Sequence, residues 1–157
     1  MEIRFPYINV SFWALGGFGI SGTLIVIADE SKKELLPINA PMLEGQLLAS
    51  YLQQVTTRRP LTHQLMNNLF SKLNIKIEKI VISDLRDNTF YATIHYTCGG
   101  IKYTQDSRPS DAIILAVISR VFIYIEEEVI KKYKETLEDL KYQEMLASLD
   151  PDKMYKM

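Results

Sequence analysis

The chain has 157 residues, of which 47% are hydrophobic and 24% charged, and its formal net charge is −1. This length predicts one domain with a substantial buried core, and the composition excludes a disordered or fibrous protein. The near-neutral charge also excludes a generally cationic surface, so any contact with nucleic acid requires a local group of basic residues.

Cys98 is the single cysteine, which excludes an internal disulfide and favours a cytoplasmic location. The soft metal ligands of the whole chain are Cys98, His63 and His95. Zinc sites are built mainly from cysteine and histidine, and the three residues of these types in this chain do not predict a zinc site. A metal bound by this chain is therefore expected to have oxygen ligands.

Residues 8–28 carry no charged side chain and are about long enough to span a bilayer. Four glycines break the middle of this segment and β-branched residues crowd its end, which favours two buried strands joined by a glycine-rich turn. The charges of Glu2 and Arg4 cancel, so the basic start of a secretory signal is missing. We expect no contact with a membrane.

The next segments predict a hairpin and two helices. Polar residues 29–33 separate two apolar runs, which is typical of a β-hairpin. A helix is expected from Pro41 to about Gln54, in which Gly45 costs about 1 kcal/mol relative to alanine. A second helix is expected over 62–74, with Thr62 as its N-cap. One apolar face is formed there by Leu65, Met66, Leu69, Phe70 and Leu73.

Alternating apolar residues then predict three strands, which cover 76–85, 88–97 and 99–105 and are joined by turns at 86–88 and 99–100. Pro109 is suited to the first position of a helix, and residues 112–118 are almost all apolar, so this helix is expected at the centre. A short buried strand, 121–125, and a helix that starts at the glutamates 126–128 follow.

The predicted fold class is α+β. We expect a single domain over 1–133, with one mixed, mostly antiparallel sheet and about three core helices, at 41–54, 62–74 and 109–119. Residues 134–157 are polar and of helical character, and they are expected to form a C-terminal helical extension.

The stretch "DSRPSDAII", 106–114, has two interpretations. In the simpler one it is a well-made helix start, with Pro109 at the first position, Asp111 in the first turn, and Ser107 or Ser110 as a source of cap oxygens. In the functional interpretation its acids and its arginine take part in catalysis. Phosphodiester cleavage needs carboxylates for a hard divalent ion and an arginine for the phosphate, and oxygen ligands favour magnesium or manganese.

Six stretches of the chain belong together as a pattern: "LLPI" (35–38), "LEGQLLA" (43–49), "RPLTHQLM" (59–66), "DLRDNTFYA" (84–92), "DSRPSDAIILAV" (106–117) and "IYIEEEVI" (123–130). In this order and at this spacing they resemble the bifunctional nuclease family, whose name comes from deoxyribonuclease and ribonuclease activity. The resemblance covers residues 35 to 133.

The resemblance implies a set of site residues. Asp106 and Asp111, with Glu44 as a third acid, are expected to hold a divalent ion, Mg²⁺ or Mn²⁺. Arg108 and Arg59, with Ser110, are expected to contact substrate, and His63 to act as a general acid or base. His63, Asp106, Arg108 and Asp111 are thus the expected catalytic residues.

Two functions stay open at this point. The first is a metal-dependent nuclease with loose sequence preference, which cleaves phosphodiester bonds of DNA or RNA. The second is a non-catalytic oligomeric module that binds a small anion or a protein partner, in which the arginines and acids form internal ion pairs. Free strand edges and many apolar residues also predict a homo-oligomer, with a dimer as the simplest case.

Overall fold

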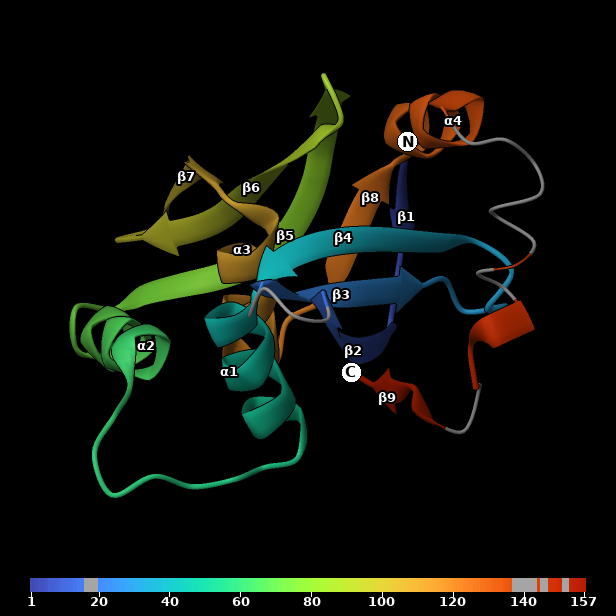
Figure 1. Cartoon of the computed structure of the whole chain (residues 1–157). Helices are drawn as coiled ribbons and strands as arrows, with labels where there is room; N and C mark the ends of the chain where they lie inside the picture. The colour runs from blue at the N-terminus through green and yellow to red at the C-terminus, as the bar shows by residue number, and fades with distance from the viewer. Residues whose placement is uncertain (16–19, 137–143, 145–146, 151–152) are drawn as a thin grey trace.

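The computed structural model describes residues 1–15, 20–136, 144, 147–150 and 153–157. The elements follow the order β1 (Glu2–Arg4), β2 (Tyr7–Leu15), β3 (Ile20–Ala28), β4 (Leu35–Pro41), α1 (Met42–Leu52), α2 (Thr62–Lys72), β5 (Ile75–Arg86), β6 (Thr89–Cys98), β7 (Ile101–Ser107), α3 (Pro109–Ser119), β8 (Ile123–Glu126), α4 (Glu127–Thr136) and β9 (Tyr155–Lys156). The α+β class is confirmed, as are the hairpins and the helices expected near 41–54, 62–74 and 109–119 (Figure 1).

The described strands form two sheets, where a single sheet was expected. One has the order β1-β8-β5-β6-β7 and is mixed, because β5 and β8 run parallel. The other has the order β4-β3-β2-β9 and is antiparallel. Alternating apolar residues predict the hairpins within each sheet but not how hairpins combine. Here β8 and β1 occupy the edge of β5 that the N-terminal hairpin would need in order to join one sheet.

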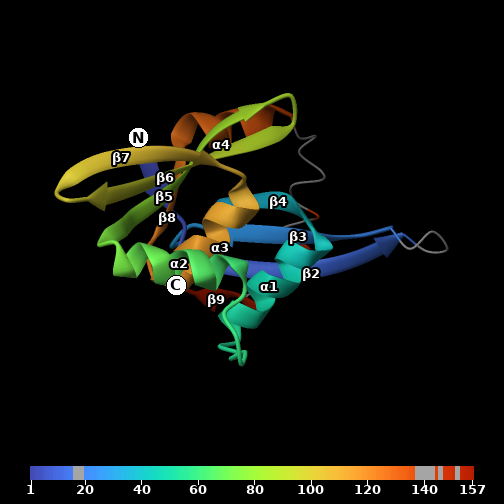
Figure 2. The ribbon, with the colours of Figure 1, turned by 90° about the vertical axis from the view of Figure 1, so that its left-hand side faces the viewer.

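Helix α3 lies at the centre of the molecule, as its composition predicts (Figure 2). Ala112, Ile113, Ile114 and Ala116 have no exposed surface, and the helix packs against α1, α2, β4, β5 and β6. Their side chains belong to one core that also includes residues of both sheets. The start of α3, which carries the motif, is therefore held from several sides.

Helix α1 packs tightly against β3 at a glycine. A Cβ atom at Gly45 would clash with the side chain of Thr23, which is fully buried. The glycine weakens the helix as such, but it lets α1 approach the sheet closely. This approach positions Glu44, the preceding residue, at the edge of the core.

Helix α2 buries only part of its predicted apolar face. Phe70 packs against the core as expected, but Leu65, Leu69 and Leu73 of the same face are 50%, 49% and 64% exposed. The inward side also carries His63 and Asn67, and Oδ1 of Asn67 accepts a hydrogen bond from the Ser119 hydroxyl at the end of α3. Tertiary contacts of polar groups thus decide how the helix is oriented. The N-cap also differs, because it is Leu61 and not Thr62.

Residues 155–156 near the end of the chain pair with the hairpin of β2 and β3. Strand β9 pairs with β2, and Leu149 and Met154 pack on the face of the N-terminal sheet formed by Val26, Ala28 and Leu35. The expected C-terminal helix therefore ends in a strand, since β2 offers a free edge for pairing. The part of the extension at 137–143, 145–146 and 151–152 lies outside the described residues. Among the residues described, no helix has both the length and the apolar composition needed to cross a bilayer.

Candidate active site at the start of α3

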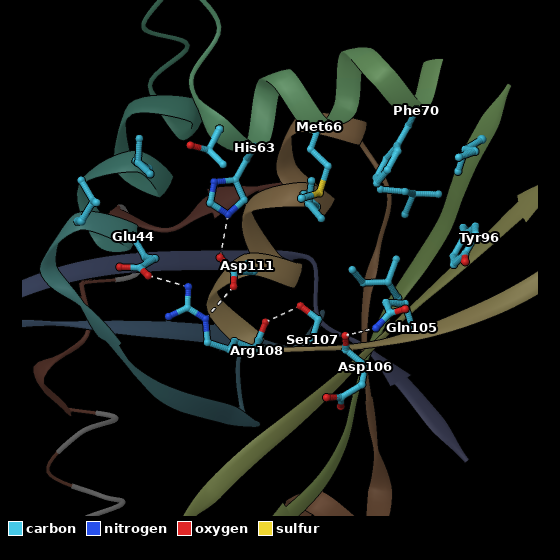
Figure 3. A pocket seen from close by; sticks show the side chains of 17 residues that line it. Glu44, His63, Met66, Phe70, Tyr96, Gln105, Asp106, Ser107, Arg108 and Asp111 are labelled. Carbon is cyan, nitrogen blue, oxygen red and sulfur yellow. Dashed lines mark hydrogen bonds and ion pairs between the residues drawn. The ribbon is translucent and has the colours of Figure 1, made fainter. Parts of the chain in front are cut away.

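A pocket of about 700 Å³ lies between α1, α2, the start of α3 and one face of the strands β5–β7 (Figure 3). One side of it is apolar and includes Met66, Phe70, Ile77, Ile94 and Tyr96. The other side is polar, with charged or titratable side chains from three helices. This polar side is formed by Glu44 of α1, His63 of α2, and Arg108 and Asp111 at the start of α3.

The local structure of the motif explains how its side chains reach the pocket. Arg108 is the N-cap residue and has extended backbone angles, while Pro109 occupies the first turn of α3. No side chain caps this helix by a hydrogen bond. Asp111 lies in the first turn, where the positive end of the helix dipole favours a carboxylate, three positions after Arg108 and on the same side. The simpler interpretation of a capped helix start therefore accounts for Pro109 but not for the charged pair.

Four side chains form a continuous hydrogen-bonded row, which Figure 3 shows as dashed lines. Nε2 of His63 lies 2.8 Å from Oδ1 of Asp111. Nε of Arg108 donates to Oδ2 of Asp111 at 2.7 Å, and Nη2 of Arg108 donates to Oε1 of Glu44 at 2.8 Å. The row brings together residues that are up to 67 positions apart, from Glu44 to Asp111.

The charges in the row stabilise one another. Partial burial raises the pKa of Asp111, but hydrogen bonds from Arg108 and His63 outweigh it, so the pKa lies below the ordinary 3.8. The same Asp111 and Glu44 carboxylates raise the pKa of Arg108 above its usual range. With a neutral imidazole the formal charge of the row is −1, because two carboxylates surround one guanidinium. Anion binding here therefore depends on local donors and not on an excess of positive charge.

His63 is buried, although a histidine at a helix start is usually exposed. It is 8% exposed, and its Nδ1 atom has no hydrogen-bond partner among the described residues and is closed to solvent. A carboxylate only accepts hydrogen bonds, so Nε2 carries the proton in the pair with Asp111. In a neutral imidazole Nδ1 then carries the lone pair and is the nitrogen that can accept a proton.

The structure separates two of the expected substrate-binding residues from this row. Arg59 is exposed in the segment before α2 and does not line the pocket. Ser110 is 5% exposed, within the first turn of α3, and does not line it either. Their expected contacts with substrate stay predictions.

The three acids that were expected to hold a metal are not gathered at one point. Asp106 borders the pocket. It pairs with Thr93 of β6, however, so its side chain lies on the face of β7 opposite to the one that meets Ala92 and Ile94. In Figure 3 it points away from Asp111. Glu44 and Asp111 direct oxygens at Arg108, and no group of three potential metal-ligating residues occurs among those that the structure describes. This arrangement does not fit a divalent ion, and we assign no step to one.

Sequence reasoning missed the apolar side of the pocket. Phe70 was expected only as part of an apolar helix face, and Tyr96 only as a residue of an alternating strand. Neither was expected to line a pocket. Tyr96 also stacks on Tyr103, with ring centroids 5.4 Å apart. The inward positions of β6 could be read from the alternation at Ala92, Ile94 and Tyr96, but their meeting with α2 depends on tertiary packing.

The comparisons with known proteins give the family. A sequence model described as the bifunctional nuclease domain matches residues 25–138. The chain belongs to the bifunctional nuclease domain family. The matched range contains α1, α2, β5–β7 and α3, and thus every residue of the hydrogen-bonded row.

This member of the bifunctional nuclease domain family is also similar in sequence to three curated proteins. An uncharacterized protein of Mycobacterium tuberculosis strain H37Rv is 29% identical over 133 residues, which cover 85% of this chain and 79% of the relative. An uncharacterized protein of strain CDC 1551 gives the same values. A protein of Oryza sativa subsp. japonica named bifunctional nuclease 2 is 24% identical over 134 residues, which cover 83% of this chain but 38% of the relative.

Proposed function

We propose that the pocket binds a nucleotide unit of single-stranded DNA or RNA, and that the chain hydrolyses phosphodiester bonds with loose sequence preference. Membership of the bifunctional nuclease domain family supports a nuclease-related role. The observation that carries the proposal is the hydrogen-bonded row from His63 to Glu44 along the polar side of a pocket whose other side is apolar and aromatic.

Arg108 is the group that contacts the phosphate. Of the five N–H donors of a guanidinium, the hydrogen bonds to Asp111 and Glu44 use two, and the side chain is 58% exposed. The remaining donors suit phosphate oxygens, which guanidinium groups bind in a planar, two-point manner. Glu44 and Asp111 fix the plane of the guanidinium in advance, which lowers the entropic cost of binding.

His63 acts as base and then as acid in the hydrolysis. Asp111 holds the imidazole with its proton on Nε2, so Nδ1 takes a proton from the attacking water as the water oxygen bonds to phosphorus. Nδ1 returns this proton to the leaving oxygen as the original P–O bond breaks. This is the arrangement in which a carboxylate orients a histidine by one nitrogen and leaves the other for the reaction. Because Nδ1 is closed to solvent here, the proton transfer requires that neighbouring side chains move aside when substrate binds.

The apolar side of the pocket accommodates the base. Phe70 and Tyr96 present aromatic rings there, beside Met66 and several isoleucines. Stacking of a base on an aromatic ring contributes about 1–3 kcal/mol and hardly depends on which base is bound. A single strand can place an unpaired base in such a pocket without first breaking a base pair, so we expect single strands to be better substrates than duplexes.

A second function is favoured by a different observation. The carboxylates of Glu44 and Asp111 neutralise Arg108, and Nδ1 of His63 is shut from solvent, as in a structural network. On this basis we also propose a non-catalytic alternative, in which the pocket binds a small ligand with a planar apolar part. Both functions use the same cavity but differ in what they require of His63.

Cleavage assays with two site variants and one control distinguish these functions. Purified wild type, His63→Gln, Arg108→Lys and the control Arg58→Ala are assayed on labelled single-stranded DNA and RNA. Arg58 is an exposed arginine outside the pocket. A nuclease loses at least about 100-fold in rate in His63→Gln, as is usual when a general base is removed. It also loses rate in Arg108→Lys, because lysine lacks the planar two-point contact with phosphate, and keeps its rate in the control. Equal cleavage by wild type and His63→Gln contradicts the nuclease. Binding of nucleotides without cleavage by any variant supports the alternative.

A further inference from the structure

Strand β7 is an open edge of the five-stranded sheet. It pairs with β6 on one side, and within the described part of the chain no strand pairs with its other side (Figure 2). Its register with β6 is continuous from Ile101 to Ser107, whereas the pairing of β5 with β6 has two irregularities. The strand contains no proline or bulge of the kind that blocks edge-to-edge pairing, so its backbone groups are available to another strand.

We propose that β7 pairs antiparallel with β7 of a second copy of this chain, about a two-fold axis at Thr104. The two sheets then form one continuous sheet. An antiparallel pair related by such an axis must place residues of the same face opposite each other. Centring the pair on Thr104 satisfies this condition and is the register that pairs all seven residues of the strand.

Charge complementarity selects the same register. With Thr104 on the axis, Lys102 lies opposite Asp106 of the partner subunit, and by symmetry the pair occurs twice. Opposite charges directly across two strands stabilise the pairing, and like charges weaken it. Both side chains are exposed, and neither forms an ion pair with any residue that the structure describes. A second copy supplies the partner that each lacks.

The other face of β7 connects this interface to the pocket. Ile101 and Tyr103 are 59% and 43% exposed, and Tyr103 stacks on Tyr96 of the pocket wall. In the proposed register the partner's Tyr103 lies opposite Gln105, and the partner's Ile101 opposite Ser107. Gln105 and Ser107 both line the pocket. Each copy therefore adds an aromatic and an aliphatic side chain to the rim of the other copy's site.

The proposal is tested by charge exchange and sedimentation analysis of the full chain. We expect a dimer for wild type, a dissociation constant raised roughly tenfold in Lys102→Glu and in Asp106→Lys, and recovery in the double variant Lys102→Glu/Asp106→Lys. Lys131→Glu, on the exposed side of α4, makes the same change of charge as Lys102→Glu away from β7 and is expected to leave the constant unchanged. A monomeric wild type, or single variants as tight as wild type, would overturn the proposal.

Cross-linking tests the register itself. In a Cys98→Ser background, Thr104→Cys places two thiols opposite each other across the axis, close enough for a disulfide. Oxidation is expected to give a covalent dimer for Thr104→Cys and none for Thr97→Cys, which lies on the same face of the interior strand β6. Because the measurements report mass and not cleavage, they stand whether or not the pocket is a nuclease site. Equal cross-linking of both variants contradicts the register.

Discussion

Asp111 lies 2.8 Å from Nε2 of His63, a residue 48 positions earlier in the chain. This contact joins the first turn of α3 to the first turn of α2, and Arg108 extends it to Glu44 of α1. Three helix starts thus meet at one side of the pocket. Backbone N–H groups at the start of α3 are partly positive, and they favour the carboxylate of Asp111 in its first turn.

The pKa of Asp111 makes stability depend on pH. Burial raises this pKa, but bonds from Arg108 and His63 lower it further, to below 3.8. A carboxyl whose pKa is lower in the folded state contributes stability above its unfolded value and loses it as the pH falls through the folded value. We expect Asp111→Asn to lower the free energy of unfolding by about 1–2 kcal/mol at neutral pH. The difference from wild type should shrink below about pH 4.

Urea unfolding at neutral pH and at about pH 3 measures both effects, the lower value chosen to lie below the ordinary carboxyl pKa. Asp87→Asn serves as the control, since Asp87 lies in the exposed turn between β5 and β6 with a positive φ that asparagine also adopts. The control should follow wild type at both pH values. A constant difference between Asp111→Asn and wild type across this range would mean that the carboxylate charge contributes nothing.

The start of α3 was predicted from the sequence because the residues that form it act locally. Pro109 and Asp111 favour the first turn of α3 through backbone geometry and the helix dipole, and neither effect depends on distant contacts. The orientation of Asp106 was not predicted, because it depends on which face of β7 meets the core, and this is settled by pairing with β6. The meeting of His63 with Asp111 likewise depends on how α2 packs on α3.

The exposed leucines of α2 provide a test of that packing. Leu69→Gln should change the free energy of unfolding by less than about 0.5 kcal/mol, because the side chain is already half exposed. Phe70→Ala should cost about 2–3 kcal/mol, since the ring packs against the core and leaves a void. The two residues are adjacent within α2, so both substitutions test the same part of the helix. If Leu69→Gln were the more destabilising variant in chemical unfolding, the helix would be rotated.

Gly45 is expected to resist replacement by alanine. In an ordinary helix this change stabilises by about 1 kcal/mol. Here the new methyl group would meet the side chain of Thr23, which is enclosed in the core, and we expect a net loss of about 1–3 kcal/mol. Thermal unfolding measures the loss. Gly45→Ala combined with Thr23→Ala, which removes both Oγ1 and Cγ2 at the contact, should recover part of it, and no recovery would locate the strain elsewhere.

The arrangement of the acids predicts how the protein responds to magnesium. Glu44 and Asp111 both bind Arg108, and Asp106 is on the other face of its strand. An ion that binds only the folded state stabilises it by RT ln(1 + c/Kd) at the free ion concentration c, so a site with appreciable affinity raises the melting temperature. Since the acids do not converge, we expect millimolar MgCl₂ to leave the melting temperature of the free protein equal to that in NaCl of the same ionic strength.

The variant Arg108→Gln tests whether the arginine is what keeps the ion from binding. Removing the guanidinium frees the carboxylates of Glu44 and Asp111, which then face each other without a cation and repel. A divalent ion is expected to bind between them, so that MgCl₂ raises the melting temperature of Arg108→Gln and not that of wild type. An equal rise in both proteins would show that the ion binds while Arg108 is in place, and the acids would then have to rearrange around it.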